Sequence, residues 1–74
     1  MSPAQAHHTL AGLAAAETFR VFTVRTMDGR EFEVEMAQRI ALPSNPSAGT
    51  FAVYVGVELH IVGLDAIASI EVAR

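Results

Sequence analysis

Residues 22–34 read FTVRTMDGREFEV, and this stretch decides the fold. Apolar and polar residues alternate on both sides of Met27-Asp28-Gly29, with the period of two that is typical of β-strands. An aspartate followed by glycine suits a type I turn that closes with a residue in the left-handed conformation, which glycine adopts readily. We therefore predict a β-hairpin that turns at these three residues.

The register of this hairpin follows from which residues would share a face. A two-residue loop would place Val24 opposite Glu33, and a carboxylate would then enter the apolar face. A three-residue loop instead pairs Val24 with Phe32 and Arg25 with Glu31, so that apolar meets apolar and opposite charges meet. We predict the three-residue loop.

A helix is expected before the hairpin, over about residues 3–16. Ser2 suits the N-cap, Pro3 suits the first helical position, and Gln5 stands where a capping box places its second residue. We expect residues 1–8 to be frayed. The helix face that packs on the rest of the chain is formed by residues at helical spacing, namely Ala6, Leu10, Leu13 and Ala14.

The rest of the chain continues with strands and one loop. The pattern allows the second strand to continue as far as Leu42, after which the Pro-, Ser- and Gly-rich residues 43–49 form a loop. We expect further strands over 51–57, 59–62 and 68–73, with one helical turn before the last of them. A tight turn at Gly56-Val57-Glu58 would pair Val55 with Leu59, Val53 with Ile61, and Tyr54 with His60.

The predicted fold class is mainly β, as one domain over residues 1–74 with a β-rich part over 19–73. Five short strands with a helical turn before the last favour a small antiparallel five-stranded barrel, or a strongly bent sheet, with a short N-terminal helix. A flat sheet with the helix on one face is the alternative. The expected interior consists of Phe22, Val24, Phe32, Val34, Val53 and Ile61, with the glutamates of the first hairpin in water.

About residues 10 to 72 resemble a set of uncharacterised small bacterial proteins. Those proteins share a short N-terminal helix, a Phe-x-x-Phe strand, an Asp-Gly-Arg-x-Phe-x-Val hairpin and a closing Ile-Glu. The matching segments here are 19–24, 28–34, His60-Ile61, Leu64-Asp65-Ala66-Ile67 and Ile70-Glu71. Where those proteins often have His-Pro after the hairpin, this chain has Met36-Ala37-Gln38. The resemblance implies a bacterial or phage protein and no particular activity.

In architecture the chain is also similar to Sm-like and SH3-like barrels. Sm-like proteins have an N-terminal helix, an Asp-Gly hairpin and a helical turn before the last strand, and they form rings that bind RNA. This chain lacks their second-strand glycine and their Asp-x-x-(Met)-Asn signature, so their RNA-binding residues have no counterparts here. A shared architecture does not by itself imply a shared function.

Composition narrows the functional classes. The chain has 74 residues, no cysteine, a net charge of −3 and 51% hydrophobic residues. Disulfides and cysteine-ligated zinc are excluded. A domain this small cannot bury so large an apolar fraction alone, so we expect it to pack against another copy or another protein. The acidic charge disfavours nucleic acid, for which the candidate contacts would be Arg20, Arg25 and Arg39.

Few residues form a pattern that suggests chemistry. Tyr54 and His60, if they oppose each other, could hold a small ligand or exchange a proton. His7 and His8 are adjacent on a helix and point about 100° apart, so we expect no metal site. No residue pattern calls for a cofactor.

The favoured hypothesis is a non-catalytic interaction module that associates with itself. One alternative is an Sm-like oligomer that binds RNA or single-stranded DNA. The other is a small ligand-binding protein or enzyme that uses Tyr54 and His60. With no apolar run near the roughly 20 residues that span a bilayer and no signal-peptide pattern, we expect a cytoplasmic protein that does not contact membranes.

Overall fold

The computed structural model describes residues 1–73, which form one α-helix, six β-strands and three short 3₁₀ turns. The helix is α1 (Pro3–Ala14). The strands are β1 (Phe22–Thr26), β2 (Glu31–Val34), β3 (Ile40–Ala41), β4 (Thr50–Val55), β5 (Glu58–Gly63) and β6 (Ile67–Val72). The 3₁₀ turns are η1 (Ala37–Arg39), η2 (Pro46–Ala48) and η3 (Leu64–Ala66).

The first hairpin has the predicted register. Phe22 pairs with Val34, Val24 with Phe32, and Arg25 with Glu31. The turn closes at Gly29, whose φ of 89° is the left-handed conformation that glycine adopts without a steric penalty. The side chains of Phe22, Val24 and Val34 are fully buried, as the alternation of the sequence indicates. The glutamates of β2 are exposed on the other face.

The predicted five-stranded barrel is wrong, and so is the single bent sheet. The described strands form two three-stranded antiparallel sheets: a first sheet with the order β2-β1-β6 and a second sheet with the order β3-β4-β5. The turn η1 interrupts the strand that we expected to continue to Leu42. The residues before η1 therefore pair only with β1 and those after it only with β4. No strand pairing joins the two sheets within residues 1–73, so no barrel closes.

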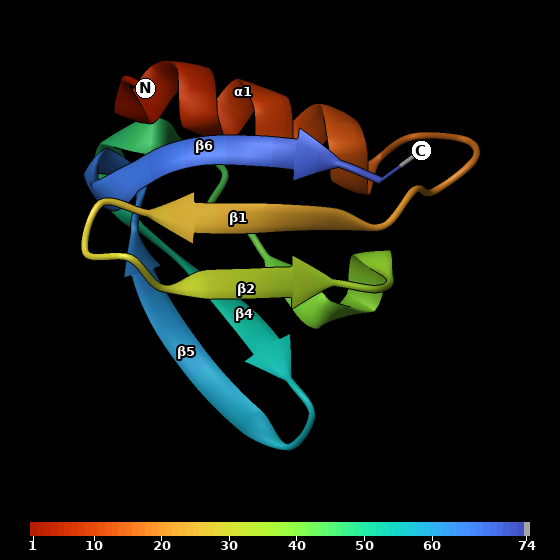
Figure 1. The fold of residues 1–74 in the computed structure, drawn as a ribbon. Helices are drawn as coiled ribbons and strands as arrows, with labels where there is room; N and C mark the ends of the chain where they lie inside the picture. The colour runs from red at the N-terminus through yellow and green to blue at the C-terminus, as the bar shows by residue number, and fades with distance from the viewer. Residues whose placement is uncertain (74) are drawn as a thin grey trace.

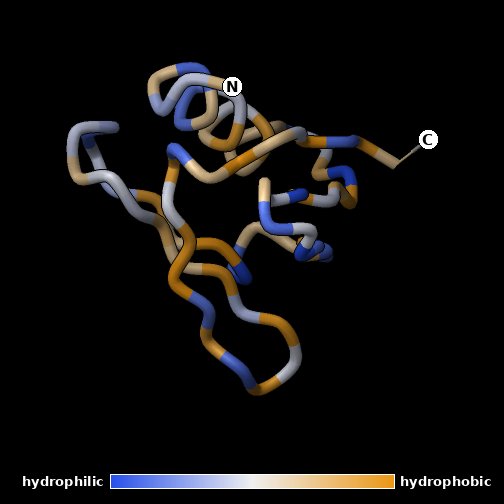
Figure 2. Tube along the Cα trace, turned by 60° about the vertical axis from the view of Figure 1, so that its left-hand side comes forward, coloured by the Kyte–Doolittle hydropathy of each residue, from blue (hydrophilic) through white to orange (hydrophobic). Residues whose placement is uncertain are grey.

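The core lies between these sheets and the helix. Figure 1 shows α1 along the top of the molecule beside β6, and the hairpin of β4 and β5 at the opposite end. Figure 2 shows this hairpin as a projecting loop that is hydrophobic along much of its length. The buried apolar side chains are Ala6, Leu10, Phe22, Val24, Phe32, Val34, Ile40, Phe51, Val53, Val62, Leu64 and Ile67.

The helix begins at its predicted residue and ends slightly earlier than expected. Ser2 accepts a hydrogen bond from the Gln5 amide, and the Gln5 side chain accepts one from the Ser2 amide, which completes the capping box. Ala6 and Leu10 are fully buried. The first turn of the helix, which we expected to be frayed, is thus capped and anchored. No helix within residues 1–73 has the length and apolar character needed to cross a bilayer.

Gly12 offers a simple test of the helix. It is exposed in the interior of α1, and a β-carbon there would meet no atom outside the local helix backbone within 4 Å. Gly12→Ala should therefore raise the free energy of unfolding by about 0.5–1 kcal/mol, because alanine loses less backbone freedom on folding. Urea unfolding followed by circular dichroism measures this change. A decrease in stability would contradict the placement of Gly12 on the free side of the helix.

Candidate functional site

The second hairpin has a different register from the predicted one. Its turn contains two residues, Gly56 and Val57, so Tyr54 pairs with Leu59 and His60 pairs with Val53. Gly56 has a φ of 62°, which suits such a tight turn. Tyr54 and His60 consequently lie on opposite faces of the second sheet. The candidate site, which required these two side chains to oppose each other, is therefore not formed.

His60 takes part in a contact between the two sheets. Its ring centroid lies 5.0 Å from that of Phe32 on β2, and its Nε2 lies 3.7 Å from a carboxylate oxygen of Glu58. The guanidinium of Arg30 lies over the Phe32 ring at 5.4 Å from the centroid. Phe32 is only 5% exposed, so this cluster covers the edge of the core where β2 approaches β5. The role that these contacts support for His60 is structural.

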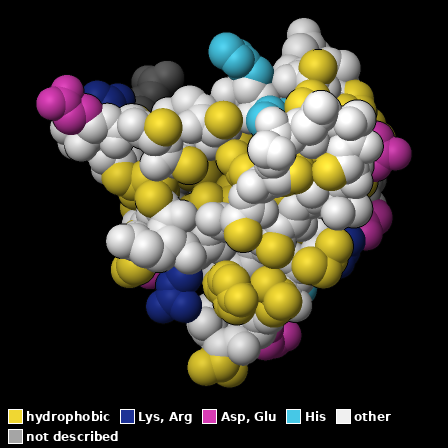
Figure 3. All heavy atoms as spheres, turned by 180° about the vertical axis from the view of Figure 1, so that it is seen from behind, with side chains coloured by type: hydrophobic (Ala, Val, Ile, Leu, Met, Phe, Trp, Pro, Cys, Tyr) yellow, Lys and Arg dark blue, Asp and Glu magenta, His cyan; other side chains and the backbone are white. Residues whose placement is uncertain are grey.

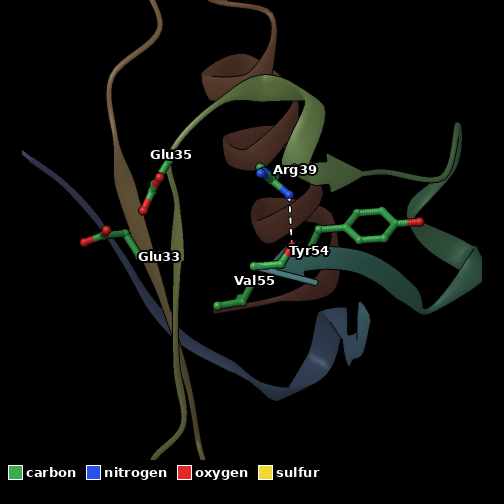
Figure 4. Close-up of a pocket in the computed structure, with 6 residues that line it drawn as sticks. Glu33, Glu35, Arg39, Tyr54 and Val55 are labelled. Carbon is green, nitrogen blue, oxygen red and sulfur yellow. Dashed lines mark hydrogen bonds between the residues drawn. The ribbon is translucent and has the colours of Figure 1, made fainter. Parts of the chain in front are cut away.

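A charged groove lies between β2 and the turn of the second hairpin. It has a volume of about 250 Å³ and is lined by Glu33, Glu35, Arg39, Tyr54, Val55 and Gly56. The two glutamates lie on one side of it (Figure 4). Arg39 belongs to η1, and one of its Nη atoms donates a hydrogen bond to the Gly56 carbonyl oxygen, with 3.0 Å between the two atoms. The Tyr54 ring points away from the glutamates, whereas Val55 points toward them (Figure 4). The groove therefore has the charges to bind polar groups but no pairing of a nucleophile with a base.

A second hollow of about 260 Å³ lies beside the turn of the first hairpin, where Arg25 and Arg30 line it with Ser69 of β6. Carboxylates already hold both guanidinium groups. Arg25 lies 3.4 Å from Glu31 and 3.4 Å from Glu71, and Arg30 lies 3.0 Å from Asp28. An anion bound here would have to compete with these exposed ion pairs, each of which contributes at most about 1 kcal/mol.

Asp28 has a structural role in the turn of the first hairpin. Its carboxylate accepts a hydrogen bond from the Thr26 hydroxyl and another from the Arg30 guanidinium. The Thr26 hydrogen bond, together with the Arg30 charge, holds the pKa of Asp28 below its ordinary value. The carboxylate therefore stays ionised, and it is fixed in the turn rather than free to act as an acid.

The structure does not gather the candidate nucleic-acid contacts into one basic patch. Arg25 lies on β1 between carboxylates of its neighbouring strands, and Arg39 is bound to a backbone carbonyl at the other sheet. Arg20 is exposed in the segment between α1 and β1. The three arginines lie on three separate segments, and carboxylates neutralise Arg25. They do not form the continuous positive surface that phosphate binding requires.

His7 and His8 lie on different sides of α1. His7, which we placed in a frayed polar end, is half-buried, and its Nε2 lies 2.6 Å from the Pro43 carbonyl oxygen, so it links the helix to the loop before η2. His8 is exposed. Among residues 1–73, no three side chains of histidine, aspartate or glutamate are grouped so that they could hold a metal ion.

Sequence reasoning predicted an unburied apolar excess but missed its position, which is the second hairpin. Ile61, which we expected in the core, is 60% exposed, and Val62 is buried in its place. Leu59 and Tyr54 are also exposed, at 51% and 42%. Seen from behind, hydrophobic side chains gather in the lower part of the molecule, at the height of this hairpin (Figure 3).

A signal for this surface is present in residues 51–55, where both sets of alternating positions are apolar. A strand with one wet face alternates apolar and polar residues, so such a run gives both faces of β4 an apolar character.

In comparisons of the sequence with protein families and curated proteins, and of the structure with solved structures, no match is found.

Proposed function

We propose that this chain is a non-catalytic protein-interaction module that associates with itself. The observation that carries the proposal is the exposure of large apolar side chains on one hairpin, above all Leu59 and Ile61. A soluble domain that leaves several large apolar side chains together on one surface loses the stabilisation that their burial would provide, about 1.5–3 kcal/mol for each full side chain. Contiguous apolar surface of this kind marks interaction sites.

The small size of the domain also supports self-association. Fully buried residues are confined to a small set between the sheets and the helix, although half of the chain is hydrophobic. Chains shorter than about 80 residues commonly gain further stability from disulfides, metals or partners. The sequence has no cysteine, and the described residues offer no metal cluster. Association with a second copy is the source of further stability that we propose for this domain.

The two alternative functions have less support. Binding of RNA or single-stranded DNA would require basic residues that act together, and Arg25 and Arg39 are already held in separate places. A ligand site or an enzyme built on Tyr54 and His60 would require a shared face, and the register of β4 and β5 separates them. Neither pocket provides an arrangement of nucleophile and base that would replace that pair.

Sedimentation equilibrium of the wild-type chain tests the proposal. We expect a reversible dimer or higher oligomer whose fraction rises with protein concentration between tens and hundreds of micromolar, because mass action favours the associated form. A single monomeric species over that whole range would overturn the proposal. Binding of an unstructured oligonucleotide at low salt, with affinity falling as salt is added, would support the nucleic-acid alternative instead.

A further inference from the structure

The outward side of the second sheet is apolar except at one end, where Thr50 pairs with Gly63. Along a strand, alternate side chains point to opposite faces. Because Phe51, Val53 and Val62 are buried between the sheets, the residues that alternate with them point outward. We define the outer apolar face by its residues: Ala41, Ala52, Tyr54, Leu59 and Ile61. Tyr54 lies directly opposite Leu59, and Ala52 lies directly opposite Ile61 and Ala41, so these side chains form one continuous surface.

The outward side of the first sheet differs in charge. Thr23 of β1 lies between Glu33 and Glu71, and Arg25 lies opposite Glu31. The strand positions on that side thus carry three carboxylates and one guanidinium. If two copies met through this surface, carboxylates would face carboxylates, and like charges that lie directly opposite destabilise a contact. The outer apolar face carries no charge and has no such penalty.

We infer that a second copy of this chain packs on the outer apolar face, so that the two β3-β4-β5 sheets lie against each other about a two-fold axis. This inference rests on the proposed self-association and assigns the surface that produces it. A two-fold axis brings the same patch of both copies together, so the patch must complement itself. A neutral apolar sheet does so in the way that sheets pack in a sandwich, with about 10 Å between them.

The area of the face predicts how strong this dimer is. Strands β4 and β5 have six residues each and are about 20 Å long, whereas β3 has two residues; with about 4.8 Å between strands, the sheet projects an area of about 220 Å². A stable interface of standard size buries about 800 Å² on each partner. The outer apolar face is therefore sufficient for a weak dimer that exchanges with monomer, and not for a permanent one. This is why the test must extend to hundreds of micromolar.

The variant that tests the assignment is Ile61→Lys, with Val57→Lys as its control. Both substitutions add one positive charge to the same hairpin at an exposed residue, but Val57 is fully exposed in the turn, outside the face. In sedimentation equilibrium, Ile61→Lys should weaken dimerisation at least tenfold, because the two-fold axis brings two lysines into an apolar interface. Val57→Lys should change the dimer dissociation constant less than threefold. Equal effects of the two variants, or no effect of Ile61→Lys on a wild-type dimer, would overturn the assignment.

A measurement on the wild-type chain keeps the test independent of how the variants fold. Amide chemical shifts recorded at increasing protein concentration should move mainly at Ala41, Ala52, Tyr54, Leu59 and Ile61. Shifts concentrated on β6, or on the glutamates of β2, would show that the copies meet elsewhere and would overturn the assigned face while leaving self-association intact. A wild-type chain that is monomeric at all concentrations removes the proposed function itself, so the two failures are distinguishable.

Discussion

Replacement of Phe22 by alanine is expected to lower the free energy of unfolding by about 3–5 kcal/mol, as for other buried aromatic side chains. Phe22 is fully buried in β1, where it pairs with both Val34 and Val72, and its ring lies 5.8 Å from that of Phe19. The substitution therefore leaves a cavity beneath the central strand of the first sheet. For a chain of this length a total stability of about 4–11 kcal/mol is typical, so the variant should be largely unfolded or close to it.

Urea unfolding followed by circular dichroism measures this loss, with Val57→Ala as the control. Val57 is fully exposed, and its truncation should change the free energy of unfolding by less than about 0.5 kcal/mol. Both proteins should be studied at low micromolar concentration, where self-association is weakest. A loss below about 1 kcal/mol for Phe22→Ala would mean that β1 is not the buried centre of the first sheet.

The second large effect is expected for Leu10→Ala, which should cost about 2–5 kcal/mol. Leu10 is fully buried and is the main anchor of α1, which packs beside η2 and η3. A helix of 12 residues is marginal in water on its own, so its persistence depends on this packing. Loss of the anchor should reduce the helical signal before the sheets unfold.

Leu13→Ala is the matched control for this experiment because Leu13 lies on the same helix, three residues along, but is only partly buried. Its truncation should cost clearly less than that of Leu10. Far-ultraviolet circular dichroism and urea unfolding of the two variants give the comparison. Equal losses would show that the helix packs through a different face from the one described.

The first hairpin could be predicted from the sequence because its two faces differ in chemistry. Glu31 and Glu33 alternate with Phe32 and Val34, so a shift of the register by one residue would bury a carboxylate. The glycine in the turn and the capping box of the helix are equally specific, since each depends on a residue type with a particular backbone or side-chain preference.

The second hairpin could not be predicted in the same way because both registers bring apolar residues of β5 into the core. Shifting β5 by one residue exchanges Ile61 for Val62 in the core, and both are apolar and β-branched. The rule that holds for the first hairpin would argue against the observed register, which places Glu58 opposite Val55, but the Glu58 side chain stays in water at the exposed end of the hairpin. The turn decides between them, and a glycine in the left-handed conformation is compatible with two residues or with three.

The barrel prediction failed at Ala37–Arg39 for a related reason. Residues 36–42 contain enough apolar side chains to be a strand, and nothing in their alternation shows that the backbone turns there. In the structure Arg39 donates to the Gly56 carbonyl across the groove, a contact between residues 17 positions apart in the sequence. Local pattern cannot anticipate a hydrogen bond of that range, and it is this turn that separates the two sheets.

The two-residue turn at Gly56 and Val57 has an evolutionary consequence. Because the faces of a strand exchange when its register moves by one residue, a single inserted codon, with the turn kept at two residues, would rotate β5 so that Leu59 and Ile61 enter the core and Val62 faces water. The apolar surface that the hairpin exposes would then change through one inserted residue, with every apolar residue of the strand retained. The proposed self-association would be gained or lost in this way without a substitution on the outer apolar face.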